Sequence, residues 1–127
     1  MAAAFKPQIR LFQDWLAETR GLRFDSYDAF WRWSVTDLEG FWRAIWDYDH
    51  VLSPTPYESA LTEERMPGAV WFKGAKVNYA RQVFRHVEAA HAAGLMAIIS
   101  ENEAGQVREM SWPELKRQTA SMALTLQ

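Results

Sequence analysis

The apolar positions in the first quarter of the chain predict two short helices. Lys6–Arg20 has helical spacing, with Pro7 suited to the first turn and Gly21 to the end. Ser26 suits the N-cap of a second helix. The side chains expected to face inward are Ile9, Phe12 and Leu16, flanked by Leu11 and Trp15, and then Tyr27, Phe30 and Trp31.

The strongest helical pattern starts at Thr36. The run Thr36-Asp37-Leu38-Glu39 matches a capping box with threonine as the N-cap. Five apolar residues follow at the spacing of one broad helix face: Leu38, Phe41, Trp42, Ile45 and Trp46. We expect this helix to end near Tyr48, and Trp42 and Trp46 to be buried against the rest of the chain.

Proline and glycine interrupt the segment Val51–Val70 and forbid a continuous helix there. We predict an extended surface loop, which is longer than most loops in compact domains. Such a loop is either functional or held by protein outside this chain. The next segment, Trp71–Val77, predicts a short strand or a turn.

The last third of the chain predicts a helix, a hairpin and a second helix. Asn78 suits the N-cap of a helix to about Ala93, and Gly94 suits its end. Leu95–Ser100 and Gln106–Met110 read as two strands joined by a polar turn. In the first helix the inward side chains are expected to be Tyr79, Val83, Val87 and Ala90.

A second capping box, from Ser111 to Glu114, begins the final helix, which keeps its pattern to Gln127 with no stop signal. We therefore expect the chain to be part of something longer. One face of this helix carries Leu115, Thr119, Met122 and Leu126. The predicted fold class is α+β, with several short helices, one long loop, a β-hairpin and a C-terminal helix.

Composition narrows the functional classes. The chain has 127 residues, 49% of them hydrophobic, and a net charge of −2, so it suits one domain or part of a larger one rather than a nucleic-acid binder. It has no cysteine, which excludes disulfides and thiolate zinc sites. The N-terminus does not resemble a signal peptide, and no stretch is long and apolar enough for a membrane helix. We expect a cytoplasmic protein with no membrane partner.

Seven tryptophans are many for this length. A tryptophan buries a large area, and its indole N–H usually needs a partner. One interpretation is a tryptophan-rich local core. The other is that several rings face a surface that further protein covers.

Candidate chemistry is sparse. Asp47, Asp49 and His50 are close enough in sequence to chelate a metal, although a solvated helix end explains them equally well. Glu63 and Glu64 are a carboxylate pair, but adjacent residues seldom converge on one substrate atom, and Arg65 offers them a partner.

A basic cluster surrounds the predicted strand–helix junction, and such a cluster can attract a phosphate or can form an ordinary solvated face. Its members are Lys73, Lys76, Arg81, Arg85 and His86. The sequence has no glycine-rich phosphate loop, no G-x-S-x-G motif and no i, i+4 histidine pair. We assign no catalytic, cofactor-binding or metal-binding residue.

Three stretches together resemble the N-terminal region of acetoacetyl-CoA synthetases. In Tyr27–Tyr48 the motifs are Trp-Ser-Val and, further on, Phe-Trp-x-x-x-Trp-Asp. Arg65–His86 is the most specific stretch, with Met-Pro-Gly-Ala-x-Trp-Phe-x-Gly-Ala-x-x-Asn-Tyr-Ala. Val107–Leu126 is a strand followed by Ser-Trp-x-Glu-Leu and a helix. It looks like the entry into the AMP-binding domain of adenylate-forming enzymes. Lys73, Arg81 and Gln82 depart from the pattern.

This resemblance implies a fragment of the larger adenylate-forming ligase fold. Residues 1–110 would be an acetyl-CoA synthetase-type N-terminal domain, and residues 111–127 the start of the adenylation domain, which would be the partner of this segment. The family activates a carboxylic acid with ATP and Mg, through an acyl-adenylate, and transfers it to CoA. The motifs that bind these cofactors lie outside this sequence, so the segment itself is expected to be non-catalytic, and its oligomeric state is open.

Two alternatives to an enzyme fragment stay open from the residues alone. One is a stand-alone protein-interaction module with exposed aromatic patches. The other is a small anion- or nucleotide-binding domain that uses the basic cluster from Lys73 to His86. The reading frame beyond Gln127 would separate them.

Overall fold

A computed structural model describes residues 5–126. The predictions that touch residues 1–4 of the expected N-terminus and the final residue Gln127 lie outside the described residues. The chain forms two compact units, Met1–Val77 and Asn78–Gln127. The α+β fold class is confirmed. No helix of the described part is both long and apolar enough to cross a membrane.

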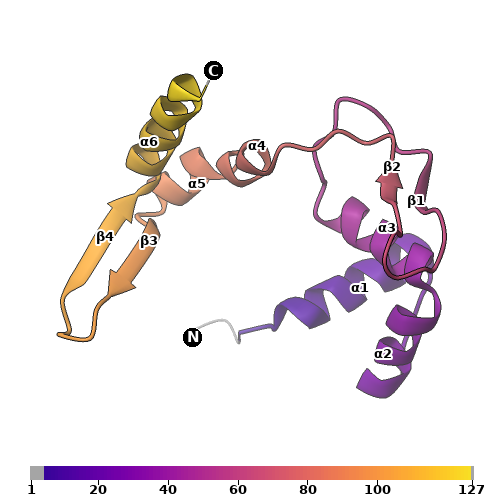
Figure 1. The fold of residues 1–127 in the computed structure, drawn as a ribbon. Coiled ribbons are helices and arrows are strands. Elements are labelled where there is room, and N and C mark those ends of the chain that lie inside the picture. Colours follow the sequence, from indigo (N-terminus) through magenta and orange to yellow (C-terminus); the bar gives the residue numbers. More distant parts are fainter. Residues whose placement is uncertain (1–4, 127) are drawn as a thin grey trace. The chain divides into compact units, whose positions relative to one another are not determined.

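Three helices and a small sheet make up the first unit (Figure 1). The helices are α1 (Gln8–Arg20), α2 (Tyr27–Thr36) and α3 (Leu38–Tyr48), and the strands are β1 (Ser59–Leu61) and β2 (Trp71–Lys73). The strands pair antiparallel, with Ser59 opposite Lys73 and Leu61 opposite Trp71. The segment predicted as one long loop therefore contains a strand. Its apolar side chains at Ala60 and Leu61 are buried, which gives the segment a reason to order.

The predicted helix ends are confirmed at two positions. Gly21 ends α1 in the left-handed conformation, with φ of 69°, and its N–H donates to the Leu16 carbonyl. Ser26 caps α2, where its Oγ accepts from the Ala29 N–H at 3.1 Å.

The cap of α3 is Asp37 and not Thr36. Thr36 is still helical in α2, and its hydroxyl donates to the Arg32 carbonyl at 2.8 Å. The Asp37 carboxylate accepts from the Gly40 N–H at 3.0 Å and from the Trp33 indole N–H at 3.1 Å. A β-carbon at position 40 would collide with the Asp37 carboxylate. The carboxylate can lie this close to the backbone of residue 40 because glycine has no side chain.

The core of the first unit is small and aromatic. Phe12, Leu16, Phe30 and Ala44 are its buried members. The Phe12 ring of α1 contacts rings from both other helices, with centroid distances of 6.1 Å to Phe30 of α2, and of 5.0 Å to Tyr48 and 6.3 Å to Phe41 of α3. Partly buried apolar side chains surround this centre: Trp15, Leu22, Phe24, Trp33, Phe41, Ile45 and Tyr48.

Several side chains predicted to face inward are exposed. They are Ile9, Leu11, Tyr27, Trp31 and Trp42. A bundle of three short helices buries only a narrow stripe of each helix, and here the stripe passes through Phe12, Phe30 and Ala44. The prediction that Trp42 and Trp46 are both buried is therefore wrong for Trp42, which is exposed, and Trp46 is only half-buried. The Trp42 ring lies 5.7 Å from the Trp71 ring, at the surface.

The second unit contains α4 (Tyr79–Phe84), α5 (Val87–Ala92), β3 (Met96–Glu101), β4 (Val107–Ser111) and α6 (Trp112–Thr125). The hairpin and the Ser111 cap of α6 are confirmed, since β3 pairs antiparallel with β4 and the Ser111 Oγ accepts from the Glu114 N–H at 3.4 Å. The sequence predicted a domain boundary at residue 110. The second unit contains residues on both sides of that position, and the boundary stays a prediction.

The helix predicted from Asn78 to Ala93 is interrupted. Asn78 caps α4 as expected, but the chain tightens after Phe84, where the His86 N–H bonds to the Val83 carbonyl, three residues back. The turn changes which side chains face inward. Val87 is buried, whereas Tyr79 is 84% exposed, contrary to the prediction.

Replacing Leu16 with alanine should destabilise the first unit by about 2–5 kcal/mol, because Leu16 is fully buried and its loss leaves a cavity. Urea unfolding followed by tryptophan fluorescence measures the change. Leu11→Ala, on the same helix but partly exposed, is the matched control and should cost clearly less. Equal losses in the two variants would contradict the core described here.

Replacing Asp37 with alanine should lower stability by about 1 kcal/mol, because the Gly40 and Trp33 N–H groups lose their acceptor. Thr36→Ala removes the hydroxyl that the sequence suggested as the cap and should have a smaller effect. Thermal unfolding of the two variants distinguishes the two candidate caps. A larger loss of stability in Thr36→Ala than in Asp37→Ala would show that Thr36 is the N-cap.

Candidate functional site

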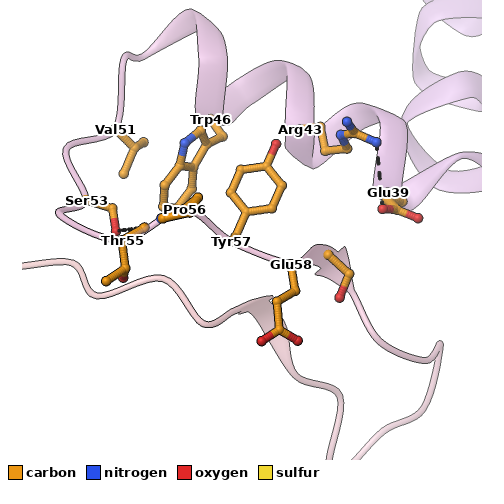
Figure 2. A pocket seen from close by; sticks show the side chains of 10 residues that line it. Glu39, Arg43, Trp46, Val51, Ser53, Thr55, Pro56, Tyr57 and Glu58 are labelled. Atoms are coloured by element: carbon orange, nitrogen blue, oxygen red, sulfur yellow. Dashed lines mark hydrogen bonds and ion pairs between the residues drawn. The ribbon is translucent and has the colours of Figure 1, made fainter.

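The main cavity of the first unit lies between α3 and the segment that precedes β1 (Figure 2). Its volume is about 460 Å³, within the range of small-molecule sites. Glu39, Arg43 and Trp46 line it from one face of α3, because they are spaced by four and three residues. Residues 51–59 supply the opposite wall, including Tyr57 and Glu58.

Three aromatic rings hold this wall against α3. The Trp46 ring lies 4.4 Å from the Phe72 ring and 5.3 Å from the Tyr57 ring, and Tyr57 and Phe72 are also 5.3 Å apart. Phe72 has φ of 46°, a left-handed conformation that is costly for a residue with a side chain. The ring contacts with α3 and the strand pairing on either side stabilise this conformation.

The charged side chains at the cavity form one close ion pair and one long one. The Lys73 Nζ lies 2.8 Å from the Glu58 carboxylate, and that hydrogen bond and charge raise the pKa of Lys73 above its usual value. Arg43 lies 3.9 Å from Glu39, which is too long for a hydrogen bond. Two hydroxyls on the far wall are already bonded, Ser53 to the Thr55 carbonyl and Thr55 to the Gly74 carbonyl.

The basic cluster predicted from sequence is divided between the two units. Lys73 and Lys76 belong to the first unit, whereas Arg81, Arg85 and His86 belong to the second. Lys73 is paired with Glu58, and the Arg85 Nε donates to the His86 Nε2 at 2.8 Å. The structure therefore does not define one anion site from these five residues.

The weak metal and acid–base candidates have ordinary surroundings. Asp47 forms an ion pair with Arg20 from α1. Within residues 5–126, no three His, Cys, Asp or Glu side chains are grouped so that they could hold a metal ion. Glu63 pairs with Arg65 at 3.3 Å, as its position suggested.

Sequence reasoning did not find Arg43, Trp46 and Tyr57 as lining residues of one cavity. Arg43 and Trp46 share a helix face, which the helical spacing indicates. Tyr57 lies in a segment without periodicity, and its contact with Trp46 depends on the strand β1 that the sequence did not predict.

Comparisons with known proteins give a consistent result. Residues 27–83 match the family described as the acetyl-coenzyme A synthetase N-terminus. This part of the chain is therefore similar to the N-terminal region of acetyl-CoA synthetases. The matched residues include α2, α3, both strands of the first unit and the residues that line the cavity.

Acetoacetyl-CoA synthetases are among the proteins to which this chain is similar. The one from Rhizobium meliloti is 30% identical over 83% of this chain and 15% of its own length. That from Macaca fascicularis is 28% identical over 84% of this chain and 16% of its own length. The structure of acetoacetyl-CoA synthetase from Streptomyces lividans matches with a TM-score of 0.80 and 37% identity, over 95% of this chain and 19% of that one.

These matches confirm the resemblance inferred from the three sequence motifs. The chain spans less than a fifth of each of these relatives. It therefore corresponds to one segment of proteins that are several times longer.

Replacing Trp46 with alanine should make the cavity wall around Tyr57 and Phe72 less ordered, because both rings lose their contact with the indole. The affected hydrogen bonds join the Glu58 N–H to the Lys73 carbonyl at 2.8 Å and the Thr62 N–H to the Val70 carbonyl at 3.1 Å. Amide hydrogen exchange at these two sites should become faster. Trp31→Ala is the control, since Trp31 is exposed on α2, and unchanged exchange in Trp46→Ala would contradict this role.

Proposed function

We propose that this chain is the N-terminal segment of an acid–CoA ligase that makes acetoacetyl-CoA from acetoacetate, ATP and CoA through an acyl-adenylate. Three of the relatives described above bear the name acetoacetyl-CoA synthetase, and each is several times longer than this chain. The segment is itself non-catalytic in this proposal. Its role is to build and support the larger enzyme.

The observation that carries the proposal is the hairpin β3–β4, whose apolar side chains are uncovered on both faces. Ile98 and Ile99 are adjacent in the strand, so they point to opposite faces, and they are 44% and 66% exposed. A strand with apolar residues on both faces is typical of a sheet that is covered on both sides. Two strands alone are marginally stable in water, so this hairpin suits a larger sheet.

The rest of the second unit has the same character. Among its described side chains, Val87 is the one large apolar group that is buried. The second half of α6 leaves Met122, Leu124 and Leu126 exposed. We propose that the adenylation domain of the same polypeptide covers these surfaces, and that residues 111–127 are the start of that domain and residues 1–110 the N-terminal domain.

ATP, Mg and CoA belong to the remainder of the enzyme in this proposal. The described residues offer no grouped ligands for a metal ion, and the sequence has no glycine-rich loop for phosphates. We derive no catalytic step from this segment. The cytoplasmic location and the role in lipid metabolism that were expected from the sequence are part of the same proposal.

The test is acetoacetyl-CoA formation by the polypeptide encoded by the complete reading frame, compared with residues 1–127 alone. We expect the complete polypeptide to convert acetoacetate, ATP and CoA, and the segment to show no acetoacetate-dependent exchange of pyrophosphate into ATP. Absence of ligase activity in a folded complete protein would favour the alternative of a protein-interaction module.

A paired substitution tests the role of the hairpin. Ile99→Asp in the complete protein should strongly reduce the folded yield, because a charge would replace an apolar contact in the proposed sheet. Ser100→Asp, one position along the same strand, is the control and should be tolerated better. A fully folded Ile99→Asp protein with unchanged melting temperature would show that nothing covers this face.

A further inference from the structure

The cavity in the first unit presents hydrogen-bond donors without matching acceptors. Three of its lining residues carry a side-chain donor: Arg43, Trp46 and Tyr57. Arg43 lies 3.9 Å from Glu39, which is beyond hydrogen-bond distance. Among the described residues, no hydrogen bond from the Trp46 indole N–H or from the Tyr57 hydroxyl is found. Figure 2 shows the Tyr57 hydroxyl directed toward α3, from which Arg43 extends.

The walls that carry these donors are held in place. Arg43 and Trp46 are three residues apart on α3, and the Tyr57 ring packs on Trp46 with its plane at 72° to the indole. Phe72 supports both rings from the other side. A binding group on such a wall loses little freedom when a ligand arrives.

The two carboxylates at the cavity, Glu39 and Glu58, leave the donor groups available to a ligand. Glu58 is neutralised by Lys73 at 2.8 Å, and in Figure 2 its carboxylate points away from the two rings. Glu39 faces Arg43 across an exposed pair, with side chains 53% and 49% exposed, and a pair of this kind is weak. A ligand with a better-placed carboxylate can therefore take its place beside Arg43.

We propose that this cavity binds a small carboxylate with a flat apolar body. Arg43 donates two hydrogen bonds to the carboxylate, a geometry that suits a guanidinium, and the Tyr57 hydroxyl donates a third. The apolar body lies against the Trp46 indole. The volume of about 460 Å³ leaves room for a molecule of this size and more. This site is independent of the proposed ligase function, because the first unit supplies all of its residues.

Two sources offer the same chemistry: a free carboxylic acid, and an aspartate or glutamate side chain from a neighbouring segment of a longer polypeptide. We assign the free acid. The cavity is wider than one acidic side chain needs, and its aromatic wall suits an apolar body attached to the carboxylate.

The test titrates residues 1–127 with sodium benzoate and follows tryptophan fluorescence and the Arg43 and Trp46 side-chain NMR signals. Benzamide, which has the same shape without the charge, is the matched ligand control. We expect saturable benzoate binding with Kd on the order of millimolar, and clearly weaker binding of benzamide. No saturation up to about 50 mM benzoate, or equal binding of the two ligands, would overturn the proposal.

Variants locate the site. Arg43→Gln should weaken benzoate binding about tenfold or more, since it removes a charge-assisted bidentate contact, and Tyr57→Phe should weaken it less. Arg32→Gln, on the neighbouring helix α2 and not among the lining residues, is the control and should bind as the unchanged chain does. Circular dichroism confirms that each variant is folded. Unchanged affinity in folded Arg43→Gln would overturn the proposal.

The complete polypeptide separates the two sources. If benzoate also binds there and still depends on Arg43, the site takes a free acid, as proposed. If binding is lost in the complete polypeptide, an acidic side chain of that polypeptide holds Arg43, and the assignment of a free acid is wrong.

Discussion

The first unit depends on the burial of Phe12 and Leu16 from α1 among the aromatic side chains of α2 and α3. Without α1, the apolar stripes of the other two helices would lack a common partner, because the Phe12 ring contacts Phe30 of α2 as well as Phe41 and Tyr48 of α3. Edge-to-face packing of such rings is both apolar and directional, so it orders the helices as well as burying them. This core fixes α3, on which the cavity is built.

The cavity follows from a second, smaller set of rings at the other side of α3. Trp46 is not part of the Phe12 core, and it contacts Tyr57 and Phe72, which come from two separate parts of the chain. These contacts bring the proline-containing segment and the strand β2 to the helix. A segment that would be costly to order by itself thus becomes a wall, because aromatic contacts and two strand hydrogen bonds offset its loss of backbone entropy.

The second unit is organised differently, because its backbone is regular while its apolar surface is largely uncovered. β3 and β4 pair antiparallel along most of their length, with one irregularity between Met96 and Ile98, and Ser111 caps α6. Yet Ile99 and Leu126 remain more than half exposed. Local signals are sufficient for these elements, whereas burial requires a layer on the other side. The similarity of the chain to one part of a longer acetoacetyl-CoA synthetase agrees with this need for a covering layer.

The sequence by itself determined the elements whose signals are local: the helices with Gly21, Ser26, Asn78 and Ser111 at their ends, the hairpin, and the family resemblance through short motifs. Capping and turn chemistry act within a few residues, so one sequence is enough to find them. Only the tertiary structure decided the rest. The pairing of β1 with β2, the exposure of Trp42 and the meeting of Arg43 with Tyr57 depend on contacts between distant residues, and helical or strand periodicity carries no information about such contacts.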